Sequence, residues 1–506
     1  MSESTTTRAR VIMHPDFTVG PVDRRLFGSF VEHLGRAVYT GIHEPDHPTA
    51  DEHGFRQDVA DLTRELGATV VRYPGGNFVS NYVWEDGVGP VAERKPFIDL
   101  AWRTVEPNLV GTDEFLQWAE RMGVEPMMAV NLGTRGVAEA AALVEYCNGE
   151  AGSRWADLRI ANGRTEPYGV RLWCLGNEMD GPWQIGHTSA DEYGRLAAQA
   201  GHAMRLVDPS IELVACGSSS MEMDTFGAWE RTVLEHCWDV VDHISMHAYY
   251  EEMDGDRATF LASGTAMDTF IRRVEASADA VAARRRSDKR MTISFDEWNV
   301  WYLKTRFPGE SNLPLQRDAP RIIEDVYSGL DAVVVGDLLV TLLNHADRIA
   351  VACLAQLVNV IAPIMTEPGG EAWRQPTFHP FAATARLASG SALDLRVESP
   401  TTTTRHGETP LVTAAATWDE ATGRFALFCT NRSPEPVEVT LEHTGLDVRL
   451  GTGTRLVADH EPAVAGPEHA ARVAERCLSS VPAPGSSTLT LAPESWTAWE
   501  GTAARG

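Results

Sequence analysis

Two glutamates stand directly after apolar runs that are typical of buried strands. Glu178 follows Leu175-Gly176-Asn177, and Glu297 follows Ser294-Phe295-Asp296. A single glutamate at a strand end is more often a solvated charge at the rim, but two such endings can point into one cavity. A pair of carboxyl groups can break a glycosidic bond, because one donates a proton to the leaving oxygen while the other attacks as an ionised nucleophile. A separation of about 5–5.5 Å between the two groups would predict retention of configuration.

The elements that would position these glutamates alternate short apolar runs with amphipathic helical patterns. Eight strand–helix pairs favour a (β/α)8 TIM barrel, an α/β fold, with a doubly wound sheet as the alternative. In such a barrel the active site lies at the carboxyl ends of the strands, where both glutamates are placed. We expect strands over 26–30, 69–73, 125–131, 170–176, 211–215, 243–247, 291–295 and 349–356, and helices over 55–66, 112–122, 137–147, 190–206 and 265–286.

Strand periodicity limits which neighbours of the glutamates can enter the cavity. Successive side chains on a strand face opposite sides, so we expect only one of Asp296 and Glu297 to point inward. The same alternation separates Asn177 from Glu178, although distortion at the strand end could bring both to the rim.

The pattern of apolar and polar residues changes past residue 390. Runs that alternate at period two lie between Gly, Pro and Asn breaks, which predicts a C-terminal antiparallel β-sandwich or small barrel. The run 8–13 also reads as a strand and is expected to join that domain. We therefore divide the chain into an N-terminal strand segment (1–20), a catalytic barrel (21–388) and a β-sandwich domain (389–506). With few tryptophans, the last domain is expected to pack against the barrel rather than bind polysaccharide.

The composition excludes several classes of function. Lys and Arg number 44 against 71 Asp and Glu, a formal charge of −27, so the surface repels nucleic acid and anionic membranes. The N-terminus lacks the apolar core of a signal peptide, and two amides interrupt the apolar run 349–365. We expect a cytoplasmic protein with no membrane span, and seven reduced, mostly buried cysteines.

No motif indicates a metal or a nucleotide cofactor. The segment His43-Glu44-Pro45-Asp46-His47 spells a zinc-protease pattern, but that pattern needs both histidines on one helical face, and the prolines prevent the helix. A Walker A sequence and a dinucleotide-binding glycine motif are both absent from the sequence. We therefore expect no cofactor and no metal.

Longer strings carry a resemblance to a known family. The strings are Phe27-Gly28-Ser29-Phe30-Val31-Glu32-His33-Leu34-Gly35, Arg72-Tyr73-Pro74-Gly75-Gly76-Asn77-Phe78, Trp173-Cys174-Leu175-Gly176-Asn177-Glu178-Met179-Asp180-Gly181-Pro182-Trp183-Gln184 and Phe295-Asp296-Glu297-Trp298-Asn299-Val300-Trp301. Through most of the barrel, the chain thereby resembles family 51 α-L-arabinofuranosidases, a retaining group of barrel glycosidases.

The resemblance implies roles for the residues nearest the reaction. Glu178 corresponds to the general acid/base and Glu297 to the nucleophile. Asn177 corresponds to the asparagine that contacts the sugar 2-hydroxyl, and Tyr249 to the tyrosine that orients the nucleophile.

The same resemblance implies a sugar pocket. Glu32 and Asn77 are expected to bind furanose hydroxyls, and Gln356 to contact the outer hydroxyls of the sugar. Trp102 and Trp301 correspond to aromatic side chains that wall the pocket. Without the resemblance, Gln356 reads equally well as a satisfied core amide.

Two further residues are expected behind the pocket. Arg72 is expected to orient a catalytic glutamate or Glu32, and its alternative is a simple pair with a barrel carboxylate. His247 is expected to support Glu297, with an ordinary core histidine as the alternative.

The resulting hypothesis is a retaining, exo-acting α-L-arabinofuranosidase that acts on arabinan, arabinoxylan or arabino-oligosaccharides. The resemblance also implies a homo-oligomer, with a hexamer as the expected state. An endo-β-glucanase or β-xylosidase on the same scaffold is the nearer alternative, because one barrel serves many sugars. A non-catalytic carbohydrate-binding protein is the more distant alternative.

Overall fold

The computed structural model describes residues 7–307, 309, 312–316, 318–459, 464–485 and 487–506. Eight strands pair side by side in parallel and close into a barrel, which confirms the predicted TIM barrel. The strand Leu172–Leu175, for example, is short and buried at every residue, which explains its continuous apolar sequence. The barrel strands are β3 (Gly28–Phe30), β4 (Val70–Tyr73), β7 (Glu125–Val130), β8 (Leu172–Leu175), β9 (Glu212–Ala215), β10 (His243–Tyr250), β11 (Thr292–Val300) and β12 (Ile349–Leu354).

Helices surround the barrel, and the five predicted ones agree with the structure to within a few residues. For α5 the reason is local: Ser189 accepts a hydrogen bond from the backbone N–H of Glu192, and the helix ends before Asp208-Pro209. The helices are α1 (Gln57–Leu66), α2 (Thr112–Met122), α3 (Val137–Asn148), α4 (Arg154–Ala161), α5 (Ala190–Val207), α6 (Ala228–Cys237), α7 (Arg257–Leu261), α8 (Ser263–Arg285), α9 (Gly329–Leu343) and α10 (Phe378–Leu387).

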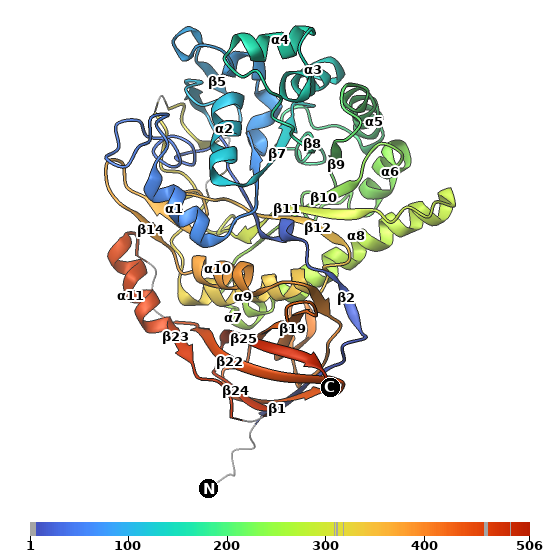
Figure 1. Ribbon diagram of the computed structural model, residues 1–506, viewed down its shortest axis with the longest axis vertical. Coiled ribbons are helices and arrows are strands. Elements are labelled where there is room, and N and C mark those ends of the chain that lie inside the picture. Colours follow the sequence, from blue (N-terminus) through green and yellow to red (C-terminus); the bar gives the residue numbers. More distant parts are fainter. Residues whose placement is uncertain (1–6, 308, 310–311, 317, 460–463, 486) are drawn as a thin grey trace.

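One helix is buried along its whole length. Every residue of α9 is buried, because the helix packs against β11 of the barrel on one side and against β19, β20, β22 and β25 of the C-terminal domain on the other. Figure 1 shows α9 and α10 between the barrel and the β-rich domain. An all-round apolar sequence is what a helix between two layers requires.

The C-terminal domain is a β-sandwich, as predicted. One sheet has the order β16-β1-β21-β24 and the other β2-β15-β19-β20-β25-β22-β23. The strands are β1 (Thr7–Met13), β2 (Thr18–Pro21), β15 (Ser391–Leu393), β16 (Arg396–Glu398), β19 (Val412–Asp419), β20 (Arg424–Asn431), β21 (Val437–His443), β22 (Leu446–Val457), β23 (Leu478–Val481), β24 (Thr488–Leu491) and β25 (Ser495–Arg505).

The N-terminal strand is part of the four-stranded sheet of this sandwich. Strand β1 pairs with β16 in the antiparallel sense but with β21 in the parallel sense, so the sandwich is not wholly antiparallel. A strand that arrives from the far end of the chain can take either direction, since no hairpin joins it to β21. The domain also carries the hairpin β17 (Thr401–Thr404) and β18 (Gly407–Pro410) and the helix α11 (Pro467–Cys477).

Buried ionic contacts join the two domains. Arg432 of the sandwich donates to Asp337 of α9 at 2.6 Å, and both side chains are almost fully buried. Arg432 also donates to the Thr265 hydroxyl of α8 at 3.0 Å. The sandwich is therefore held in one position against the barrel.

Three further predictions concern the cysteines, the segment 43–48 and membrane-spanning helices. All seven cysteines are unpaired and buried. The segment 43–48 contains no helix, so its two histidines are not on a helical face. Among the helices of the described residues, none combines the length and hydropathy needed to cross a bilayer.

Candidate active site

A cavity of about 1010 Å³ opens at the carboxyl ends of the barrel strands. Eight of the eleven predicted site residues line the cavity: Glu32, Asn77, Trp102, Glu178, Tyr249, Glu297, Trp301 and Gln356. The other three, Arg72, Asn177 and His247, are buried and do not line it.

Glu297, near the end of β11, is held by two donors. Arg72 Nη1 donates to Oε1 at 2.5 Å, and Tyr249 Oη donates to Oε2 at 2.7 Å. The guanidinium of Arg72 is itself buried and stacks over the Phe30 ring at 4.7 Å. This arrangement fixes the position of the carboxylate through a charge-assisted hydrogen bond.

Glu178 approaches the cavity from the loop after β8. Its backbone has φ of 42°, a left-handed conformation that is uncommon outside glycine and turns the side chain out of the strand's direction. His247 Nδ1 lies 2.8 Å from Oε1, and Trp183 Nε1 donates to Oε2 at 2.6 Å. Burial, and then the negative charge of Glu297, raise the pKa of Glu178 above its ordinary value.

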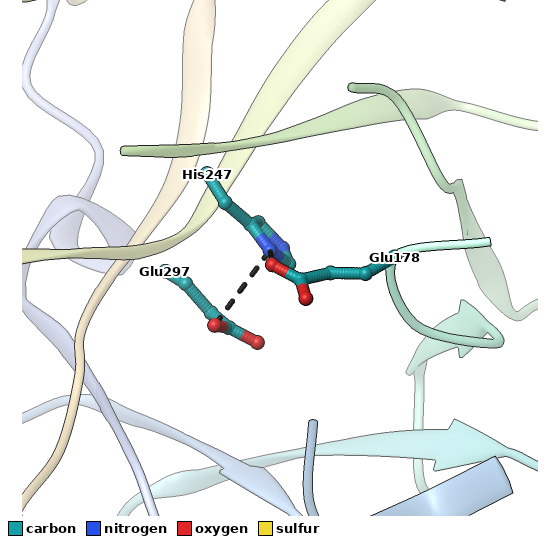
Figure 2. A group of neighbouring side chains, drawn as sticks. All are labelled: Glu178, His247 and Glu297. Atoms are coloured by element: carbon teal, nitrogen blue, oxygen red, sulfur yellow. Dashed lines mark hydrogen bonds and ion pairs between the residues drawn. The ribbon is translucent and has the colours of Figure 1, made fainter. Parts of the chain in front are cut away.

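His247 links the acidic groups, as Figure 2 shows for Glu178 and Glu297. Its Nε2 lies 3.1 Å from Asp296 Oδ1, while its Nδ1 lies 3.6 Å from Glu297 Oε2. Burial alone would lower the pKa of His247, but Glu297, Asp296 and Glu178 together raise it well above its usual range. The expectation that His247 supports Glu297 is therefore incomplete, because its shortest contact is to Glu178.

The pKa of Asp296 is lowered although the residue is buried. Burial works to raise it, but Arg72 and the hydrogen bond from His247 outweigh that effect. Arg72 Nε lies 3.6 Å from Asp296 Oδ2. Asp296 therefore favours its ionised form and shares the Arg72 guanidinium with Glu297.

The strand-alternation prediction is confirmed for the cavity, because Glu297 lines it and Asp296 does not. Asp296 nevertheless also contacts Arg72, and the pairing of β10 with β11 shifts between Ser245 and His247. An irregularity of this kind re-aims the side chains beside it. At β8 the backbone is distorted at Glu178, which lines the cavity, whereas Asn177 stays buried beside it and contacts Arg72 and Asn77.

The Pro-Gly-Gly-Asn turn after β4 passes close to the carboxylates. A Cβ atom on Gly76 would lie only 3.0 Å from Glu297 Oε1 and 3.4 Å from Asn177 Nδ2, so glycine leaves room for the site. Asn177 accepts from Arg72 Nη2 at 2.7 Å and donates to Asn77 Oδ1 at 3.4 Å. Arg72 therefore orients Glu297 and Asn177 together.

Glu32 and Gln356 also line the cavity. Its carboxylate accepts from Trp102 Nε1 and the Phe78 backbone N–H, both at 2.9 Å, and from Gln356 Nε2 at 3.3 Å. Burial raises the pKa of Glu32 to about 8. Gln356 is not a core amide with local partners only, since it faces both the cavity and Glu32.

Aromatic rings line the mouth of the cavity. Trp301 packs edge-on against Tyr249 with centroids 4.9 Å apart and lies 5.6 Å from Phe307, which in turn lies 6.4 Å from Trp102. These rings enclose the carboxylates from the solvent side. Phe307 was not predicted, because it lies in a long loop with no strand signal.

Sequence reasoning also missed the groups that hold Glu178. Trp183 lies five positions after Glu178, and Asp180 accepts from the backbone N–H of Ser219 at 3.0 Å, tying the loops after β8 and β9 together. Trp183 and Asp180 both lie in the segment 173–184 that carries the family resemblance, but their contacts depend on the backbone turn at Glu178.

Glu178, His247 and Glu297 each offer one ligand atom within 4.8 Å of the others, a spacing that a metal ion could use. The Arg72 guanidinium, however, already supplies a positive charge 2.5 Å from Glu297. The arrangement suits proton transfer and nucleophilic attack better than cation binding.

Comparisons with known proteins agree with this geometry. Residues 62–266 match the family model of the α-L-arabinofuranosidase 1 domain, and residues 296–495 match that of the α-L-arabinofuranosidase C-terminal domain. An intracellular exo-α-(1→5)-L-arabinofuranosidase of Streptomyces lividans is 56% identical over 460 residues, covering 90% of this chain and 69% of the relative. An exo-α-(1→6)-L-arabinofuranosidase of Bifidobacterium longum is 56% identical over 439 residues, covering 84% of this chain and 83% of the relative.

A solved structure shows the same overall fold. A family 51 α-L-arabinofuranosidase from Bifidobacterium longum superposes with a TM-score of 0.93 at 46% identity, over 98% of this chain and 100% of that one. The chain belongs to the family 51 α-L-arabinofuranosidases.

Proposed function

We propose that this protein releases terminal α-L-arabinofuranosyl residues from the non-reducing end of arabinose-containing saccharides, with retention of configuration. Glu178 protonates the glycosidic oxygen while Glu297 attacks the anomeric carbon, which gives a covalent arabinosyl-enzyme. Glu178 then removes a proton from the water that hydrolyses this intermediate.

The observation that carries the proposal is the contrast between two adjacent carboxyl groups. One oxygen of Glu178 and one of Glu297 lie within 4.8 Å of each other, close to the roughly 5–5.5 Å of retaining glycosidases and well below the spacing of inverting ones. Glu297 faces a guanidinium, whereas burial and Glu297 raise the pKa of Glu178. One group is thereby suited to attack and the other to hold a proton.

A balance of charge explains how the roles alternate. With Glu178 protonated, the positive Arg72 and His247 balance the negative Asp296 and Glu297. In the arabinosyl-enzyme Glu297 is a neutral ester and Glu178 has lost its proton, so the buried cluster is neutral again. Loss of the Glu297 charge also removes one cause of the raised pKa of Glu178. Glu178 then becomes a base in the second step.

The surroundings of the carboxylates support a furanose site. Glu32, Asn77 and Gln356 supply hydrogen-bonding groups on one side, and a furanose presents several hydroxyls that need partners in a water-poor pocket. With a pKa of about 8, Glu32 is largely protonated at neutral pH and can donate to a hydroxyl. Trp102 and Trp301 wall the pocket, which favours removal of one terminal sugar over cleavage within a chain.

The physiological setting follows from the relatives. Several are named intracellular exo-α-(1→5)-L-arabinofuranosidases, and we extend to this chain a cytoplasmic location and short arabinan- or arabinoxylan-derived oligosaccharides as substrates. A homohexamer is the proposed assembly. The glucanase and xylosidase alternatives are not favoured, because the relatives at 50–56% identity are named arabinofuranosidases.

The test is hydrolysis of 4-nitrophenyl α-L-arabinofuranoside alongside the β-D-xylopyranoside and a soluble β-glucan, with proton NMR of the first sugar formed. Rapid release from the arabinofuranoside with the α-anomer appearing first is expected. Activity on the xyloside or the glucan alone would reject the sugar assignment, and a β-anomer formed first would reject the retaining mechanism.

A further inference from the structure

The cavity is larger than a single terminal sugar requires. Its volume of about 1010 Å³ lies at the upper end of the roughly 300–1,000 Å³ typical of sites for drug-sized ligands, and a pentofuranose is much smaller than such a ligand. The space beyond the carboxylates is bounded by residues remote from Glu297 in sequence. We call this part the outer lobe, lined by Met221, Met223, Met253, Thr259, Arg405 and His406.

Two of these residues come from the β-sandwich. Arg405 and His406 form the two-residue tip of the β17–β18 hairpin, where Thr404 pairs with Gly407. Gly407 has φ of 91°, a left-handed conformation that closes the tight turn. The second domain therefore supplies part of the wall of a cavity whose catalytic carboxylates belong to the barrel.

The hairpin tip is tied to the barrel at three points. The Arg405 backbone N–H donates to Thr259 Oγ1 at 3.1 Å, and its guanidinium contacts Asp254 and Asp256, each at 3.1 Å. These acidic residues lie in the loop after β10, the strand that carries Tyr249. With the sandwich anchored by Arg432, the tip keeps a defined position at the lobe.

The lobe belongs to the same cavity as Glu178, the proposed proton donor to the leaving group. Glu178 must face the glycosidic oxygen, and Asp180 ties its loop to Ser219 in the loop that also carries Met221 and Met223. A saccharide attached through that oxygen would share the cavity with these methionines, whose flexible side chains adapt to varied shapes.

The lobe also offers a polar side chain for sugar hydroxyls, that of His406. Burial, with Arg432 nearby, lowers the pKa of His406, so its neutral ring can donate through one nitrogen and accept through the other.

We propose that the outer lobe binds the saccharide on the leaving-group side of the scissile bond, and that the β-sandwich takes part in substrate selection through Arg405, which holds the hairpin tip, and His406, which contacts the sugar. The proposal rests on the proposed function. It assigns the β-sandwich more than the packing role expected from the sequence.

The experiment compares two substrates that share the terminal arabinofuranose. On α-(1→5)-arabinotriose, the Arg405→Ala/His406→Ala double variant should lose about fivefold to tenfold in kcat/KM, mostly through KM, as expected for one or two lost polar contacts. On 4-nitrophenyl α-L-arabinofuranoside it should stay within about twofold. Met223→Trp, which narrows the lobe without touching the hairpin, should show the same selectivity.

The control is Arg396→Ala, which removes a 76% exposed arginine of the same domain that lies outside the cavity. Equal losses on both substrates, or no loss on arabinotriose in either lobe variant, would overturn the proposal. Failure of the proposed function looks different, because the unmodified protein would then hydrolyse neither substrate.

Discussion

Removal of the acid/base carboxyl should lower kcat/KM for substrates whose leaving group needs a proton and spare those whose leaving group does not. In Glu178→Ala the proton donor disappears, but Glu297 keeps its contacts from Arg72 at 2.5 Å and from Tyr249 at 2.7 Å. The attack on carbon is therefore preserved. A sugar leaving group needs the proton, so kcat/KM on arabinotriose should fall about 100- to 10,000-fold, or about 3–5 kcal/mol of barrier.

A dinitrophenolate leaving group needs no proton, and its first step should be nearly unaffected in Glu178→Ala. The second step lacks its base, so stopped-flow absorbance should show a burst of about one dinitrophenolate per site followed by slow turnover. In the unmodified enzyme kcat/KM on arabinotriose should fall as the pH rises through the raised pKa of Glu178, because the acid form is lost. The variant should lack this basic limb.

The matched control for this prediction is Glu120→Ala, which removes a 60% exposed glutamate of α2 that pairs with Arg164, and neither residue lines the cavity. It should behave as the unmodified enzyme on both substrates. An equal loss on arabinotriose and on the dinitrophenyl substrate in Glu178→Ala, with no burst, would refute the acid/base assignment.

Three other perturbations have defined outcomes. Tyr249→Phe removes a 2.7 Å bond to the Glu297 carboxylate, worth about 1.5–3 kcal/mol, so kcat/KM should drop about 10- to 150-fold with an unchanged melting temperature; a drop below twofold would contradict the role. Arg432→Met leaves Asp337 buried without its cation and should lower the free energy of unfolding by about 3–5 kcal/mol in denaturant titrations, whereas a change under about 1 kcal/mol would speak against the anchoring role. Burial raises the pKa of Glu32 from 4.5 to about 8, so its contribution to folding stability is full below pH 4.5 and is lost as the pH rises through about 8. The melting temperature of the unmodified protein should therefore fall over this pH range, and Glu32→Gln should flatten that fall. Parallel curves of melting temperature against pH for the two proteins would contradict the prediction.

Much of the fold could be predicted because its signals are local. The barrel strands are continuous apolar runs, and α5 begins at a capping serine and ends before a proline, so neither needs knowledge of distant contacts. The buried helix α9 shows the limit of this reasoning. Its sequence is apolar all round, and only the packing of two domains explains why.

The sequence could predict which residues form the candidate site better than which atoms contact one another there. Strand-end positions and family strings placed Glu178, Glu297 and Arg72 together, but the contact of Asp296 with Arg72 accompanies a shift in the pairing of β11 with β10. The contact of Arg405 with the barrel likewise joins segments far apart in the chain. Such contacts follow from tertiary structure and leave no periodic signal in one sequence.

The central claim is that Glu297 forms the covalent intermediate. The most direct measurement is to mix Glu178→Ala with 2,4-dinitrophenyl α-L-arabinofuranoside, quench in acid, digest, and locate the adduct by tandem mass spectrometry. The account predicts one arabinosyl group per chain, on Glu297. An adduct on another residue, or continued turnover with no adduct at any time, would contradict it.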